Sequence, residues 1–271
     1  MFYDIVESLR SRPKYKTALR LLRENTFEHD DIGPINEIGS VSMFVISIPK
    51  CATTAIQKGF ERIGHRVIHA HNNPTTYDAL ANGDLLYKEG IGLETLIWAR
   101  RRMNADPVYL FFGYREPVSW YLSLTGQFGM PLTEALRANI ASNLHDAYPW
   151  NQYRFAASQQ VVERASGLKL FSEKFDTYTG YSILKKGNIQ VVLYRFDRTK
   201  ELETYIQHNI DARFEMTRQR VNANPDYIEY VRNFRIPTAR LEALYSDNIF
   251  SHFYDPREAE QLISKYAESR R

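Results

Sequence analysis

The stretch FVISIPKCATTAI, residues 44–56, decides how this 271-residue chain is expected to fold. Its first half is a short, continuous apolar run closed by Pro49, which is typical of a buried strand. Its second half opens a segment with helical spacing that ends at Gly64, and Thr53 or Thr54 is the predicted N-cap. The stretch therefore predicts one unit of strand, loop and helix.

The same alternation continues along the chain. Further strands are predicted at 65–71, 108–117 and 189–197, and helical spacing marks 4–24, 90–107, 118–128, 133–167 and a segment from about 200. Strands that alternate with helices predict an α/β fold with a central, mainly parallel sheet flanked by helices. We expect a single domain over residues 1–271, with 1–38 as an N-terminal helical extension.

The composition limits the classes of partner. Lys and Arg exceed Asp and Glu by three and the pI is about 8.8, a mild basic excess that suits an anionic small ligand and falls short of a nucleic-acid patch. No apolar run approaches the ~20 residues that span a bilayer, and residues 1–16 lack the apolar core of a signal peptide, so we expect a cytoplasmic protein without a membrane span. The single cysteine, Cys51, excludes disulfides and thiolate metal clusters within the chain.

Residues 50–54 lie where the first strand passes into its helix. The N–H groups of a first helical turn and the helix dipole together attract an anion. Lys50 adds a mobile positive charge, and the hydroxyls of Thr53 and Thr54 can donate to oxyanion oxygens. The pattern indicates a phosphate-binding loop in which the lysine comes first, and a capped helix with a solvated lysine is the alternative.

A second basic element follows the strand predicted at 108–117. In GYREPVSWYLS, residues 113–123, Arg115 stands just past the strand and Ser123 lies eight residues later on the next helix. In a doubly wound sheet, ligands bind outside the carboxyl ends of the strands, where both Arg115 and the Lys50 loop are expected. Two anion-binding elements at one edge indicate a ligand with two separated anionic groups.

These motifs resemble those of the sulfotransferases. PKCATTAI, residues 49–56, looks like the family's 5′-phosphosulfate loop, Pro-Lys-x-Gly-Thr-Thr, and REPVSWYLS, residues 115–123, looks like its 3′-phosphate motif. VVLYRFDRTKEL, residues 191–202, is similar to a later strand and turn of the family, with Phe196 where a tyrosine usually stands. Residues 244–266 resemble the end of bacterial members connected with capsular polysaccharide synthesis.

The resemblance implies an enzyme that transfers a sulfuryl group from 3′-phosphoadenosine 5′-phosphosulfate (PAPS) to a hydroxyl of a carbohydrate or polysaccharide, without a metal ion. It implies a P-loop-like three-layer sandwich with a nucleotide-binding core at residues 40–125. Lys50 would neutralise the leaving phosphate as a catalytic residue, while Arg115 and Ser123 would bind the 3′-phosphate. The implied nucleotide-binding residues are Lys50, Cys51, Ala52, Thr53, Thr54, Ala55, Arg115, Ser123 and Phe196.

One position departs from the family's pattern. Ala52 stands where the motif has glycine. A left-handed backbone would be strained there, and a closely approaching ligand would meet a methyl group. A small residue still fits the position.

Transfer to a hydroxyl also requires a base that takes the acceptor's proton. His69 and His71 share one face of the strand predicted at 65–71 by alternation. Some polysaccharide sulfotransferases carry a similar His-x-His there, so we favour His71 and then His69. Glu89 and Glu94 remain alternatives, and His252 is interpreted as structural.

Two other functions compete with sulfuryl transfer. A P-loop kinase or nucleotidase would need a glycine-rich loop that ends in Lys-Ser or Lys-Thr, but here Lys50 precedes the threonines. A non-catalytic protein that binds a nucleotide remains open. A cysteine-dependent phosphatase would need an arginine six residues after Cys51, where Gln57 stands, so Cys51 is interpreted as a bystander.

Two clusters outside the motifs, one basic and one aromatic, are predicted to be parts of the fold and not of the site. The run ARRR, residues 99–102, is interpreted as a solvated helix face, which is also where we would look for a polyanion site. Trp150, Tyr153 and Phe155 are interpreted as core residues.

Overall fold

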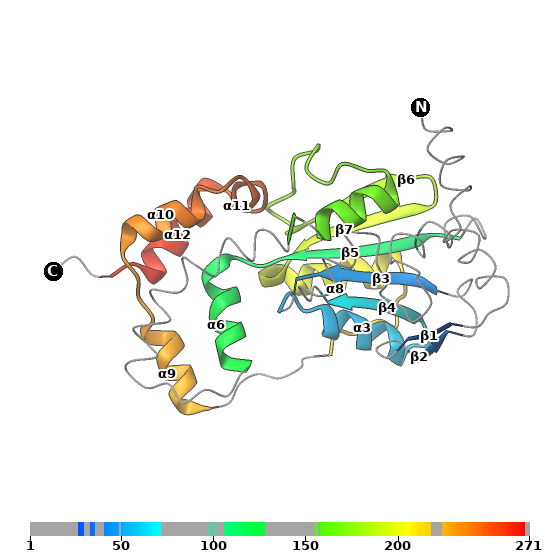
Figure 1. Cartoon of the computed structure of the whole chain (residues 1–271), viewed down its shortest axis with the longest axis horizontal. Coiled ribbons are helices and arrows are strands. Elements are labelled where there is room, and N and C mark those ends of the chain that lie inside the picture. The colour runs from blue at the N-terminus through cyan, green and yellow to red at the C-terminus, as the bar shows by residue number, and fades with distance from the viewer. Residues whose placement is uncertain are drawn as a thin grey trace.

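The computed structural model describes residues 27–29, 33–35, 41–48, 50–71, 97, 100, 106–127, 155–156, 158–217 and 224–268. Its centre is a five-stranded sheet in the order β4-β3-β5-β7-β6 (Figure 1). The strands are β3 (Val41–Ser47), β4 (Arg66–His71), β5 (Val108–Tyr114), β6 (Tyr181–Lys186) and β7 (Ile189–Arg195). Every pairing is parallel except that of β6 with β7, so the predicted α/β fold with a mainly parallel sheet is confirmed.

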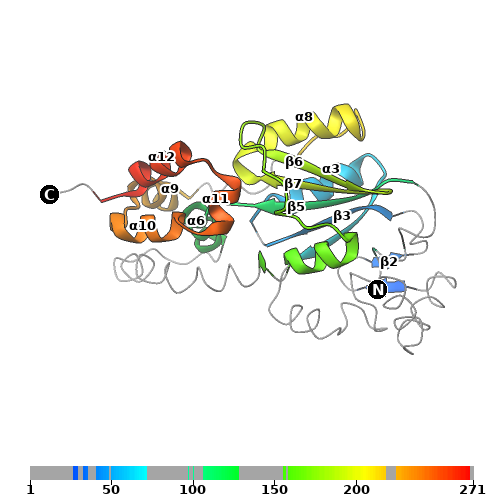
Figure 2. The same ribbon diagram turned by 90° about the horizontal axis from the view of Figure 1, so that it is seen from above.

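Helices cover both faces of the sheet. The helices α3 (Thr53–Arg62) and α8 (Thr199–Asn209) lie on one face, and the green helix of residues 158–166 lies on the other (Figure 2). Two separate hydrophobic clusters result, because side chains alternate along each strand. On β3, for example, Val45 belongs to the cluster under α3 and α8, whereas Phe44 belongs to the opposite one.

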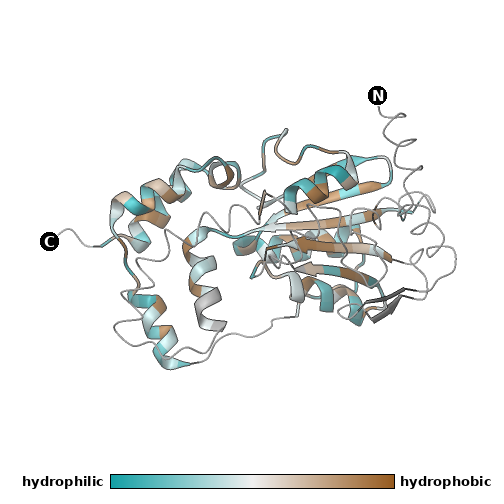
Figure 3. Cartoon of the chain, in the orientation of Figure 1, coloured by the Kyte–Doolittle hydropathy of each residue, from teal (hydrophilic) through white to brown (hydrophobic). Residues whose placement is uncertain are grey.

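Strongly hydrophobic residues gather in the inner strands of the sheet, whereas the helices mix polar and apolar residues (Figure 3). β3, β5 and β7 are buried along almost their whole length. Parallel strands covered on both faces appear as continuous apolar runs, which is why these strands could be predicted from the sequence.

The chain changes the direction in which it adds strands between β3 and β5. From β3 it passes through α3 to the outer neighbour β4, whereas from β5 it continues to β6 and β7 on the opposite side. β3 and β5 pair only from Met43 to Val45, although β3 continues to Ser47. Their carboxyl ends therefore flank a topological switch point, the place where sheets of this kind form a ligand crevice.

Helices of the C-terminal region lie beyond the carboxyl ends of the strands, near α6 (Pro117–Gln127) (Figures 1 and 2). They are α9 (Pro225–Asn233), α10 (Thr238–Tyr245), α11 (Asn248–Phe253) and α12 (Pro256–Tyr266). Phe253 stacks on Tyr114 at the end of β5, with ring centroids 4.5 Å apart. The C-terminal helices thus place aromatic side chains at the edge where the site is expected.

β6 has no counterpart among the strands predicted from the sequence. This strand forms the edge of the sheet and ends in the exposed residues Lys185 and Lys186, so it lacks the apolar run of a central strand. Gly187, with a φ of 60°, and Asn188 connect it to β7. Two such residues between strands are a hairpin signal that the analysis did not use.

Only a small part of the N-terminal segment, residues 27–29 and 33–35, belongs to the described residues. Residues 4–24, the expected helical part of the 1–38 extension, lie outside the described residues. Within the expected 1–38 extension, β1 (Phe27–His29) and β2 (Gly33–Ile35) are short antiparallel strands. No helix in the described ranges is both long and apolar enough to cross a lipid bilayer.

Candidate functional site

The loop after β3 follows an unusual backbone path. Lys50, with a φ of 70°, and Ala52, with a φ of 62°, are both left-handed although neither is glycine. Ala52 is the N-cap of α3, so the prediction of Thr53 or Thr54 as N-cap is wrong, and no side chain caps this helix. Left-handed non-glycine residues cost about 1–3 kcal/mol each, and such strain collects at functional sites. No N-cap side chain accepts from the first turn of α3. The Ala55 N–H donates to the Ala52 carbonyl at 3.0 Å, so Thr53 and Thr54 carry the N–H groups that suit a ligand.

Tyr194 holds this loop from two strands away. Its hydroxyl donates a 2.7 Å hydrogen bond to the Cys51 carbonyl across β5. The ring passes over Gly113, its register partner on β5, where a Cβ would overlap it. The Ser47 hydroxyl donates to the Gly113 carbonyl at 2.7 Å and ties the two strands where they part. A lone glycine in an apolar strand signals such a close approach, but the sequence analysis did not single it out.

The Arg115 guanidinium connects the two sequence motifs. Its Nη1 donates to the Lys50 carbonyl and its Nε to the Ser119 hydroxyl, both at 3.0 Å. Within the described part of the chain, Nη2 donates to no residue and Arg115 forms no ion pair. Burial lowers the pKa of Arg115, and Cys51 and Glu116 oppose that shift, but a guanidinium stays charged in proteins. Arg115 is thus a cation with one nitrogen directed to no described residue.

Phe196 lies against the face of the same guanidinium. The Arg115 Cζ is 3.8 Å from the centre of the Phe196 ring, a distance typical of a cation–π contact. Phe196 opens the short 3₁₀ helix η2 (Phe196–Arg198) directly after β7. Arg115 therefore contacts both Lys50 and Phe196, and the three residues follow three adjacent strands at one edge of the sheet.

Ser123 is half-buried on α6, one helical turn beyond Ser119. Residues four apart share a helix face, so the two serines lie on the same side of α6. Ser119 is the one that bonds to Arg115. Ser119 was not predicted as a site residue, although its place four residues after Arg115 is a signal for it. The predicted role of Ser123 remains a prediction.

The other residues of the loop differ in their exposure to solvent, and so in how readily a ligand could contact them. Cys51 is fully buried, and burial raises the pKa of its thiol to about 12, so it stays protonated near neutral pH and is no nucleophile. This agrees with its interpretation as a bystander. Thr53 is only 2% exposed, whereas Thr54 and Ala55 are half-buried. A ligand would therefore meet the Thr54 hydroxyl more readily than that of Thr53.

His69 lies in the layer between β4 and α3. Its Nδ1 is 2.6 Å from Gln57 Oε1, and Gln57 Nε2 donates to the Glu61 carboxylate at 2.8 Å. A carboxylate only accepts hydrogen bonds, so Glu61 sets the orientation of the Gln57 amide. The amide oxygen in turn requires the proton of His69 on Nδ1, and the neutral ring then carries its lone pair on Nε2.

His71 is the last residue of β4 and pairs in register with Ser47, the last residue of β3. Its backbone thus reaches the edge of the sheet that also carries the Lys50 loop. His69 lies two residues earlier along the strand. Glu89 and Glu94, the alternative bases, lie outside the described residues.

Two residues outside the motifs, Arg100 and Phe155, test the structural roles predicted for the basic and the aromatic cluster. Arg100 is buried and its Nε donates to the Val41 carbonyl, so a solvated helix face is wrong for this residue. Phe155 is 1% exposed and confirmed as a core residue. Trp150 and Tyr153 lie outside the described residues.

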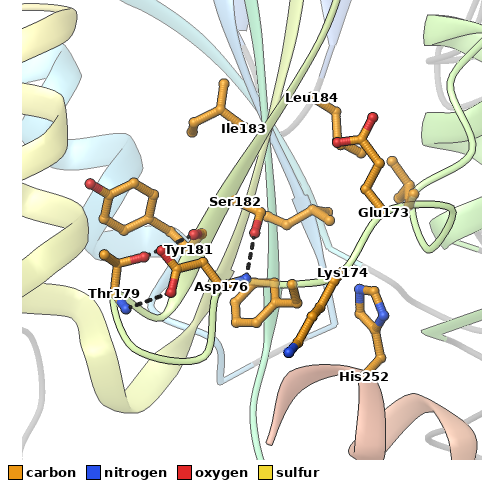
Figure 4. Close-up of a pocket in the computed structure, with 12 residues that line it drawn as sticks. Glu173, Lys174, Asp176, Thr179, Tyr181, Ser182, Ile183, Leu184 and His252 are labelled. Carbon is orange, nitrogen blue, oxygen red and sulfur yellow. Dashed lines mark hydrogen bonds between the residues drawn. The ribbon is translucent and has the colours of Figure 1, made fainter.

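A cavity of about 310 Å³ lies against β6, between this strand, residues 173–176 and His252 (Figure 4). Its polar lining includes Glu173, Lys174, Asp176, Ser182 and His252, and leucines and Phe175 supply its apolar part. His252 also packs on Phe171 with ring centroids 4.5 Å apart, and burial lowers the pKa of its imidazole. This packing agrees with a structural role, but the cavity itself was not predicted.

No group of three metal-ligating side chains is present among the described residues. Comparisons of the chain with protein-family models, with curated proteins and with solved structures gave no match. The residues at the switch point and their geometry are therefore the features that indicate a function.

Proposed function

We propose that this chain is a PAPS-dependent sulfotransferase, built on a P-loop-like three-layer sandwich, that acts on a carbohydrate hydroxyl. The observation that carries the proposal is the 3.0 Å hydrogen bond from Arg115 Nη1 to the Lys50 carbonyl. It joins the two loops whose motifs resemble the 5′- and 3′-phosphate sites of one nucleotide. Both loops flank the switch point between β3 and β5, where ligands of such sheets bind.

The two loops suit a nucleotide with a phosphate on each side of its ribose. The uncapped first turn of α3 and the Lys50 ammonium would hold the 5′ side. Arg115 would bind the 3′-phosphate through its remaining N–H groups, and Phe196 would keep the guanidinium plane in place for a two-point contact.

PAPS would supply the activated sulfuryl group. As the acceptor oxygen bonds to sulfur and the bond from sulfur to the phosphate oxygen breaks, negative charge grows on that oxygen. Lys50 and the N–H groups of the first turn of α3 would stabilise this charge. His71 would take the proton of the acceptor hydroxyl, and His69, whose Nε2 carries the lone pair, is the second candidate.

The cavity beside β6 suits the acceptor. Its mixture of apolar and polar groups matches a sugar, which has apolar faces and a rim of hydroxyls. Neighbouring strands are about 4.8 Å apart, so β6 lies about 14 Å from β3 across the sheet. A single sugar ring would not fill the cavity and reach Lys50, whereas an oligosaccharide would do both.

The described carboxylates at the strand ends argue against a kinase. A kinase would need one of them for Mg²⁺. Asp197, after β7, instead binds Arg195 and accepts from the Tyr254 hydroxyl at 2.8 Å. Glu116, after β5, accepts two backbone N–H groups of α6. Both carboxylates already serve the protein itself.

The test is calorimetric titration with adenosine 3′,5′-bisphosphate, ADP and AMP. The wild-type protein should prefer the bisphosphate, and Arg115→Ala should weaken its binding by about 100-fold, because a charged two-point contact is lost. Arg213→Ala, at an exposed arginine paired with Asp211, is the matched control and should bind like the wild type. Equal binding of the three nucleotides would overturn the proposal.

Catalysis needs a separate measurement. His71→Ala should abolish sulfuryl transfer to an oligosaccharide while the affinity for the bisphosphate stays within twofold. Such a split would exclude the non-catalytic alternative. A wild-type protein that binds the bisphosphate but transfers no sulfuryl group from PAPS to any member of an oligosaccharide panel would favour that alternative.

A further inference from the structure

Two residues of the proposed 3′-phosphate site stand directly beside residues that hold the C-terminal helices. Arg115 is followed by Glu116, which is 5% exposed. Phe196 stands between Arg195, which is 2% exposed, and Asp197. Any shift of these neighbours moves Arg115 or Phe196, because they share a peptide bond.

Glu116 connects the site to α10 and α12. Its carboxylate accepts from the Tyr245 hydroxyl at 3.1 Å and from the Tyr266 hydroxyl at 3.4 Å. Burial raises the pKa of both phenols, so they stay protonated and donate. A buried carboxylate needs such donors to offset the loss of water. Tyr245 and Tyr266 therefore fix the position of the Glu116 carboxylate, and with it the position of the first turn of α6.

Arg195 connects the site to α11 and α12. Its guanidinium binds the Asp197 carboxylate at 2.5 Å, the Glu258 carboxylate at 2.8 Å and the Phe253 carbonyl at 3.2 Å. It also lies 3.8 Å from the centre of the Tyr254 ring. The residues on both sides of Phe196 are thus held by residues 253–258.

We infer that α10, α11 and α12 form a positioning frame for the 3′-phosphate end of the site. Tyr245 and Tyr266 act on Arg115 through Glu116, and Tyr254 and Glu258 act on Phe196 through Arg195 and Asp197. None of the four frame residues is assigned to the ligand itself, so they are positioning residues. The inference rests on the proposed function, because it assigns Arg115 to a 3′-phosphate.

The test compares the affinities for adenosine 3′,5′-bisphosphate and for AMP in the full chain. The two ligands differ by the 3′-phosphate. The dissociation constant for AMP divided by that for the bisphosphate therefore isolates the contribution of the Arg115 end, and this ratio falls when that end is disturbed. The double variant Tyr245→Phe/Tyr266→Phe should bind the bisphosphate about tenfold more weakly, the scale of losing hydrogen bonds to a charged group. Its affinity for AMP should change by less than about twofold.

Two matched variants separate positioning from general loosening. Tyr178→Phe removes a hydroxyl from an 88% exposed tyrosine and should change neither affinity. Ile263→Ala weakens the packing of α12 one turn before Tyr266 and should lower thermal stability while the ratio stays intact. A ratio that falls equally in Ile263→Ala would overturn the inference, because any loosening of α12 would then suffice.

The outcomes also separate this inference from the proposed function. A wild-type protein without preference for the bisphosphate refutes the proposed function. A wild-type preference that survives unchanged in the double variant refutes the positioning frame alone. If the double variant does not fold, Tyr254→Phe tests the other connection, and it should reduce the same ratio by about threefold through loss of one hydrogen bond to Asp197.

Discussion

The helices α3 and α6 begin at the same switch point, but their N-termini are built in opposite ways. At α6, the Glu116 carboxylate accepts the N–H groups of Val118 and Ser119 at 2.8 and 2.6 Å. At α3, the N-cap is Ala52 in a left-handed conformation, and no side chain caps the helix. One helix carries its own anion and the other does not.

The two helix N-termini therefore differ in whether they can bind an external anion. A helix N-terminus attracts negative charge, and Glu116 already satisfies this preference at α6. Only α3 then suits a phosphate bound by backbone N–H groups. The contribution of the α6 loop comes instead from a side chain, the Arg115 guanidinium. A ligand with two phosphates would be held by backbone on one side and by a cation on the other.

The largest expected effect comes from removing the anion of α6. Glu116→Ala should lower the free energy of unfolding by about 3 kcal/mol, since it removes a helix cap and leaves the Tyr245 and Tyr266 hydroxyls without their acceptor. Urea denaturation measures the loss. Glu116→Gln keeps an acceptor and should lose less, and equal losses in both variants would show that the charge itself is required.

The next effect comes from giving α3 an anion of its own. Ala52→Asp should weaken AMP binding by at least about 100-fold, equivalent to about 2.7 kcal/mol, because the new carboxylate would repel the phosphate. Stability should be maintained, since a negative charge at a helix N-terminus is favourable. The isosteric, uncharged Ala52→Asn is the control, and calorimetry checks both. Unchanged AMP binding would remove the phosphate from the N-terminus of α3.

A smaller effect concerns the thiol inside the α3 loop. Folding raises the pKa of Cys51 from 9.0 to about 12 because the thiol is buried. The unfolded chain therefore loses this proton first, and stability should fall as the pH rises from about 9 toward 12. Between pH 8.5 and 10, Cys51→Ala should lose about 1 kcal/mol less than the wild type. Equal losses would indicate that the thiol is not buried as described.

The smallest effect comes from relaxing the backbone of α3. Ala52→Gly should raise the free energy of unfolding by about 1 kcal/mol, because glycine adopts a positive φ without strain. It should also bind the 5′-phosphate at least as tightly, since the methyl group is gone. Ala55→Gly, in the first turn of α3, is the control and should lower the free energy of unfolding by about 1 kcal/mol. A destabilised Ala52→Gly would contradict the left-handed conformation.

The parts of the fold that could be predicted are those set by local patterns. β3, β5 and β7 are continuous apolar runs, and their parallel arrangement follows from the helices between them. Parallel strands end at one edge, which is why the Lys50 and Arg115 loops could be expected on the same side of the sheet. The polar edge strand β6 lacks such a run, and only its Gly187-Asn188 turn gives a local signal.

The rest of the site depends on contacts between residues far apart in the chain. Tyr194 reaches Cys51 across 143 residues and only because Gly113 has no side chain. Tyr245 reaches Glu116 across 129 residues. No periodicity encodes such pairs, since each tyrosine fits its own strand or helix equally well without its partner. That a left-handed Ala52 would be strained could be stated from the sequence, because the motif that this loop resembles has a glycine there.

The connection between Glu116 and Tyr266 also has a consequence for the newly made chain. The two residues are 150 positions apart. A ribosome adds about 5–20 residues per second, so about 8 to 30 seconds separate the synthesis of the carboxylate from that of its last hydroxyl donor. During that interval the sheet can assemble, but the loop that carries Arg115 lacks one of its supports. Competence for the nucleotide would therefore be acquired late in biosynthesis, after the central strands have been made.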